Sequence, residues 1–79
     1  MMKKVNIYTS NTCGYCTMAK DYFKEQNVEY IEHNVSDNAD ARKELMKMGY
    51  MSVPVILIEG EEEAILGFDK DRIDSVLGL

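Results

Sequence analysis

The sequence has little of what marks membrane, nucleic-acid-binding or metal-holding proteins. It contains no apolar run approaching the roughly 18 to 20 residues that span a bilayer. Its net charge of −5 is not interrupted by a basic stripe, which disfavours phosphate backbones and anionic lipid as partners. One histidine and two cysteines fall short of the four ligands of a closed zinc site, so we expect no resident metal.

The N-terminal lysines are followed by neither a long apolar segment nor a small-residue cleavage site, so no secretory signal is expected. The expected compartment is the cytosol, where permanent structural disulfides are uncommon. A bridge between Cys13 and Cys16 would close a very short loop and would stabilise the fold little. Their spacing therefore indicates a reactive pair rather than a structural staple.

What the chain does contain is one alternating series of strands and helices. Its 79 residues suffice for a single domain, residues 1–79, and 46% of them are apolar. Runs of β-branched, aromatic and other apolar residues predict strands over residues 3–9, 28–34, 55–58 and 63–66. Helices are predicted over residues 13–26, from a cap within 36–38 to about 48, and after the capping Asp69. The order is β-α-β-α-β-β-α, with the first two strands parallel and the last two antiparallel.

Cys13 and Cys16 enclose a Gly-Tyr pair at the junction between the first strand and the first helix. Residues three apart on a helical turn have Cβ atoms about 5–6 Å apart, close enough for a disulfide. At a helix start, free backbone N–H groups and the helix dipole stabilise an anion, and this lowers the pKa of a thiol. We therefore expect Cys13 to attack a substrate disulfide and the better shielded Cys16 to resolve the mixed disulfide.

Other residues of possible chemical interest have simpler interpretations. His33 is interpreted as a hydrogen-bonded strand residue rather than a catalytic base, because the helix terminus already activates Cys13. Met46, Met48 and Met51 are interpreted as core-filling side chains rather than a cofactor site. The acidic stretch over residues 59–63 is interpreted as a solvated hairpin.

Once Ser52-Val53-Pro54 is added to the cysteine motif and the element order, the whole chain resembles the glutaredoxin family of the thioredoxin fold. The resemblance implies a thioredoxin-like α/β domain with a four-stranded mixed sheet and helices on both faces. It also implies a cis peptide bond before Pro54, and pairing of the Val53 backbone with an extended substrate or with glutathione. The residues that it implies in substrate or glutathione binding are Thr12, Tyr15, Ser52, Val53, Pro54, Gly67, Phe68 and Asp69.

The sequence departs from the family's usual pattern around the expected glutathione site. Gly14 replaces the motif proline, and Ser10 stands where glutaredoxins often carry a basic residue for the carboxylate of glutathione. In the later Gly-Gly-x-Asp element, Leu66 replaces the first glycine, whereas Gly67 and Asp69 match. The same element is also similar to the redoxins of ribonucleotide reductase, which take electrons from a flavoprotein reductase.

The resemblance implies a monomeric, cytoplasmic thiol–disulfide oxidoreductase that carries electrons to protein or glutathione-mixed disulfides. No bound cofactor is expected; glutathione is the expected reductant, and a flavoprotein disulfide reductase is the other candidate donor. The alternative function is a glutathione-assisted iron–sulfur cluster carrier, because some glutaredoxins with a small residue in place of the motif proline bridge a cluster between two subunits. A third alternative is a reductase dedicated to one enzyme, such as ribonucleotide reductase or a peroxidase.

Overall fold

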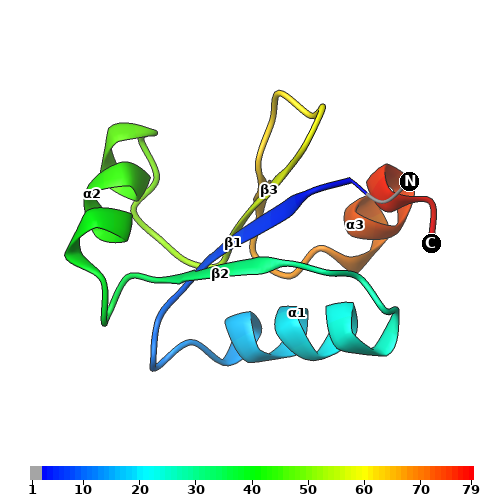
Figure 1. Cartoon of the computed structure of the whole chain (residues 1–79), viewed down its shortest axis with the longest axis horizontal. Helices are drawn as coiled ribbons and strands as arrows, with labels where there is room; N and C mark the ends of the chain where they lie inside the picture. The colour runs from blue at the N-terminus through cyan, green and yellow to red at the C-terminus, as the bar shows by residue number, and fades with distance from the viewer. Residues whose placement is uncertain (1–2) are drawn as a thin grey trace.

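The chain folds as an alternating α/β structure whose element order is the one predicted from the sequence (Figure 1). The computed structural model describes residues 3–79. The elements are β1 (Val5–Thr9), α1 (Gly14–Glu25), β2 (Ile31–Asn34), α2 (Ala39–Lys47), β3 (Val55–Ile58), β4 (Ile65–Leu66) and α3 (Lys70–Leu77).

The strands form one four-stranded mixed sheet in the order β2-β1-β3-β4. β1 pairs with β2 in parallel and with β3 antiparallel, and β3 pairs antiparallel with β4. Both predicted strand relationships are confirmed: the helix-linked first pair is parallel and the closing hairpin is antiparallel. Because β1 lies at the centre of the sheet, the segment that follows it is held close to both neighbouring strands.

Helices cover both faces of the sheet, as the figure shows for α1 and α2 (Figure 1). One face packs its apolar side chains with α1 and α3, in a cluster that includes Ile7, Phe23 and Ile73. The other face packs with α2, in a cluster that includes Tyr8 and Leu45. Successive residues of β1 thus point to opposite layers, which is the period-two alternation expected of a strand buried on both sides. The expected thioredoxin-like α/β architecture is confirmed.

Three of the strands predicted from the sequence start later in the structure than expected. The strand expected from residue 28 starts at Ile31, because the Val28 N–H donates to Phe23 O at 2.8 Å and so closes the end of α1. Asn27, at φ +56°, turns the chain there. The strand expected over residues 63–66 is only Ile65–Leu66, and the one expected from residue 3 begins at Val5.

The core-filling interpretation of the three methionines is wrong. Met46 is 60% exposed, Met48 39% and Met51 95%. Helix α2 buries only a narrow stripe made by Ala41 and Leu45, and Met46 lies outside that stripe. Met48 and Met51 follow the last residue of the helix. Methionine is among the residues most often buried, so its exposure here is unusual.

None of the helices described between residues 3 and 79 combines the length and the apolarity that crossing a membrane requires.

Candidate active site

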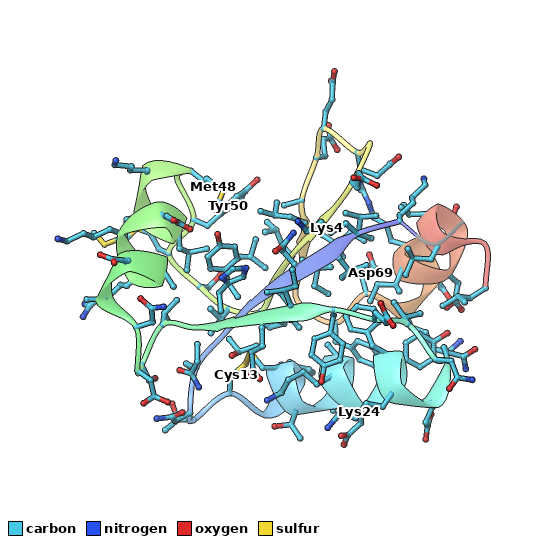
Figure 2. The ribbon with its side chains drawn as sticks, viewed as in Figure 1. Lys4, Cys13, Lys24, Met48, Tyr50 and Asp69 are labelled. Atoms are coloured by element: carbon cyan, nitrogen blue, oxygen red, sulfur yellow. A yellow bond between two sulfur atoms is a disulfide. The ribbon has the colours of Figure 1, made fainter. Side chains whose placement is uncertain are left out.

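Cys13 occupies the position immediately before α1, as predicted, and is joined to Cys16 by a disulfide (Figure 2). The two Cα atoms lie 5.2 Å apart, well within the range that a disulfide spans. Cys13 is the N-cap of the helix, with an extended backbone, and its Sγ accepts a hydrogen bond from the Cys16 backbone N–H at 3.1 Å. A thiolate on Cys13 therefore has a donor aimed at it and lies at the positive end of the helix dipole.

The two sulfurs differ sharply in access. Cys16 is 1% exposed and lies on the same buried side of α1 as Ala19 and Phe23. Cys13 is only partly buried, and its neighbours Thr12, Gly14 and Tyr15 are exposed. A partner disulfide can reach Cys13 directly, whereas Cys16 is reached from within the protein.

The turn that presents Cys13 is held by polar contacts to the segment after β2. The Asn11 backbone N–H donates to Ser36 Oγ at 3.1 Å, and Asn34 Nδ2 donates to Asn11 Oδ1 at 2.8 Å. The Val35 N–H also donates to Thr9 O at 2.8 Å, which extends the β1–β2 ladder by one step. These bonds fix the end of β1 and so aim the turn that follows it.

A second loop, remote in sequence, lies against Cys13. The Val53–Pro54 peptide bond is cis, as the resemblance implied, and Pro54 is buried. The Val53 carbonyl oxygen lies 3.7 Å from Cys13 Sγ, so the reactive sulfur and the predicted peptide-pairing backbone are adjacent. Pro54 O in turn accepts a hydrogen bond from the Gly67 N–H at 2.9 Å. Gly67 has φ +74°, a left-handed conformation that favours glycine.

Of the remaining predicted site residues, some lie near the disulfide and others do not. Tyr15 is 64% exposed beside the disulfide, and Ser52 is exposed next to Val53. Phe68 packs edge-on against Tyr22, with ring centroids 5.8 Å apart. Asp69 caps α3 by accepting from the Arg72 N–H at 3.2 Å, and Figure 2 shows it set apart from Cys13. One carboxylate oxygen of Asp69 is therefore already used in holding the helix.

A polar cluster at the end of β1 was not predicted from the sequence. The fully buried Thr9 hydroxyl donates to Glu32 Oε2 at 2.7 Å, and Lys20 Nζ donates to the same oxygen at 2.9 Å. The hydrogen bond from Thr9, then that from Lys20, holds the pKa of Glu32 below its ordinary value. Alternation along β1 is the signal that could have found it, because Thr9 follows Val5 and Ile7 on the inward face.

His33 is a satisfied strand residue, as interpreted. Its Nε2 donates to Asn6 Oδ1 at 2.9 Å, and its ring stacks on Tyr8 with centroids 4.7 Å apart. Within residues 3–79, no group of three or more His, Cys, Asp or Glu side chains could hold a metal ion.

Sequence comparison with known proteins identifies the family of this chain. The sequence model of the glutaredoxin family matches residues 5–63. A glutaredoxin-like 8.6 kDa protein from the rubredoxin operon of Clostridium pasteurianum is 36% identical over 74 residues, covering 92% of this chain and 96% of its own. Glutaredoxin 3 of Escherichia coli is 38% identical over 61 residues, covering 76% and 74% of the two chains. The chain belongs to the glutaredoxin family.

The fold is also similar to the solved structure of a glutaredoxin-like redoxin. The glutaredoxin-like NrdH-redoxin of Escherichia coli, which has a thioredoxin-like activity profile, superposes with a TM-score of 0.79 at 25% identity. The match covers 92% of this chain and 93% of that one. Membership of the glutaredoxin family, together with the Cys13–Cys16 pair, makes this chain a thiol–disulfide oxidoreductase. The iron–sulfur alternative stays a prediction.

Proposed function

We propose that this glutaredoxin-family chain carries electron pairs to protein disulfides, with Cys13 as the attacking residue and Cys16 as the resolving one. The observation that supports this assignment is the contrast between the two sulfurs: Cys13 caps α1 and is accessible, whereas Cys16 is 1% exposed. The Cys13 thiolate attacks one sulfur of the substrate disulfide, and the other substrate sulfur leaves as a thiolate. The Cys16 thiolate then attacks the Cys13 sulfur, which releases the second substrate thiol and leaves the Cys13–Cys16 disulfide.

In this proposal the substrate segment adds to the protein as a short extended strand. Its backbone pairs with Val53, whose carbonyl oxygen lies 3.7 Å from Cys13 Sγ. Pro54 is buried next to Val53, and the ring of Tyr15, which lies between the two cysteines in the sequence, is exposed and available to the substrate. Further contacts are proposed at Thr12, Ser52, Gly67, Phe68 and Asp69.

The electron donor belongs to the same proposal and has two candidates, glutathione and a flavoprotein disulfide reductase. The Asp69 carboxylate, which matches the family's glutathione element, also caps α3, and Ser10 supplies no cation. Similarity to a redoxin with a thioredoxin-like activity profile supports the flavoprotein donor. We place the monomeric protein in the cytoplasm, where either donor is available.

The first experiment measures how fast millimolar glutathione reduces the oxidised protein, by thiol trapping and mass spectrometry. Rapid loss of the disulfide would assign glutathione as donor, supported by a Cys16→Ser variant whose Cys13 thiolate attacks added glutathione disulfide, keeps one glutathione as a mixed disulfide and releases the other as a thiolate. Little reduction by glutathione, with rapid reduction by a thioredoxin reductase and its nicotinamide cofactor, would assign the flavoprotein. A Cys13→Ser variant that still reduces protein disulfides at the wild-type rate would overturn the exchange mechanism.

A further inference from the structure

A groove of about 220 Å³ lies between α2 and the loop that precedes Pro54. Its walls are mainly apolar and come from Val35, Leu45, Met46, Tyr50 and Met51. The volume is below the roughly 300–1,000 Å³ of pockets that enclose whole small molecules. A space of this size and lining suits a single apolar side chain.

The groove is continuous with the disulfide site. Ser52 and Val53 line it, and the Val53 carbonyl oxygen is the atom that lies 3.7 Å from Cys13 Sγ. On the other wall, the Val35 N–H is bonded to Thr9 O, four residues before Cys13. A chain that pairs with Val53 while its cysteine meets Cys13 therefore passes along the groove.

Two of the exposed methionines, Met46 and Met51, line the groove. Met46 is 60% exposed and Met51 95%, so their apolar surface is available to a partner. Methionine side chains are flexible and polarisable, and they adapt to apolar groups of different shape. Arg42 adds a cation to the same lining, which favours a neutral or acidic segment over a basic one.

We propose that this groove is a subsite for an apolar side chain of the substrate, an inference that rests on the disulfide-exchange function proposed above. The side chain stands two residues from the attacked cysteine in an extended segment. Residues at that spacing share a face of a strand and lie roughly 6.5 Å apart. Glutathione offers no such side chain, so the subsite favours attack on a sulfur within a protein segment over attack on the sulfur of glutathione.

The test uses short peptides whose single cysteine is disulfide-linked to thionitrobenzoate. Cys13 of the reduced protein attacks the peptide sulfur, and the coloured thionitrobenzoate leaves as a thiolate. One peptide has Leu two residues before the cysteine, one has Leu two residues after it, and one has Ala at both places. We expect one Leu peptide to exceed the Ala peptide in kcat/KM by about tenfold, the usual scale for filling an apolar subsite.

Charge placed in the groove should abolish this preference. Met46→Glu should bring the Leu and Ala peptides to within about twofold of each other, whereas Met46→Leu should keep the preference. Met48→Glu is the matched control, because Met48 is an exposed methionine at the end of α2 (Figure 2). It is not among the residues that line the groove.

The outcomes separate this inference from the proposed function. Equal rates for all three peptides in the wild type, with none in Cys13→Ser, would overturn the subsite and leave the exchange function standing. Loss of preference in Met48→Glu as well as Met46→Glu would assign the effect to surface charge and also overturn the subsite. No release from any peptide would refute the exchange function itself.

Discussion

In the reduced protein, alkylation should distinguish the two cysteines strongly. Iodoacetamide at a limiting concentration should modify Cys13 long before Cys16, because Cys16 is 1% exposed and must be uncovered before a reagent reaches it. Uncovering it requires the first turn of α1 to open. That step breaks the hydrogen bond from the Cys16 N–H to Cys13 Sγ and exposes the side chain of Cys16.

The magnitude follows from these losses. A hydrogen bond of this kind contributes about 0.5–1.5 kcal/mol net, and up to about 3 kcal/mol when one partner is charged. Exposing a small apolar side chain adds on the order of 1 kcal/mol. An opening free energy of about 2–3 kcal/mol corresponds to a rate ratio of roughly 30- to 150-fold, since about 1.4 kcal/mol is tenfold. A larger thiolate fraction on Cys13 at neutral pH works in the same direction, partly offset by the lower nucleophilicity of a thiolate of low pKa.

The assay is a brief alkylation pulse at neutral pH, followed by acid quenching, denaturation and blocking of the remaining thiols with a second reagent. Trypsin cuts after Lys4 and Lys20, so both cysteines lie on one peptide, and fragment ions that separate at Gly14-Tyr15 assign the label. A Cys13→Ser variant measures Cys16 alone. A ratio below about threefold, or faster labelling of Cys16, would refute the assignment of attacking and resolving roles.

Three further predictions concern stability, and all are measured by urea denaturation. Glu32→Gln should destabilise the protein at neutral pH, and the difference should shrink as pH falls below the ordinary carboxyl pKa of 4.5, because Thr9 and Lys20 stabilise only the ionised form. A difference that stays constant down to strongly acidic pH would contradict the lowered pKa. Asn38→Ala should cost about 1 kcal/mol, because Asn38 Oδ1 accepts from two backbone N–H groups at the start of α2; an unchanged midpoint would argue against the cap. Phe23→Ala should cost about 3–5 kcal/mol, since that ring is 0% exposed, and a loss under 1 kcal/mol would show that the core collapses to fill the gap.

Local sequence pattern was sufficient wherever the structure depends on neighbours along the chain. The element order, Cys13 at the helix start and Asp69 as the cap of α3 all follow from residues within a few positions of each other. The cis bond before Pro54 came from the family resemblance, and the structure confirms it. The sequence did not predict the late start of β2. The Val28 N–H bonds to the end of α1 instead of joining the sheet, and strand propensity does not predict such a contact.

The exposure of the methionines could not be predicted from the sequence either. Their spacing and apolar character are compatible with a core position, and only the side of α2 that faces the sheet decides that Ala41 and Leu45 are buried while Met46 is not. Burial depends on which side of a helix meets its neighbour, and composition alone does not determine that.

By itself, the sequence determined the kind of chemistry of this protein: a strand, a Cys-x-x-Cys turn and a helix together specify a redox-active sulfur pair at a helix start. Only the tertiary structure decided what surrounds that pair. The contact between Cys13 and Val53, 40 residues apart, exists because β3 pairs antiparallel with β1 and brings the loop before Pro54 to the end of β1. The Thr9–Glu32–Lys20 cluster and the groove beside Met46 arise in the same way. Such contacts depend on sheet order, because strand pairing is set by the packing of the whole core rather than by the residues of any one segment.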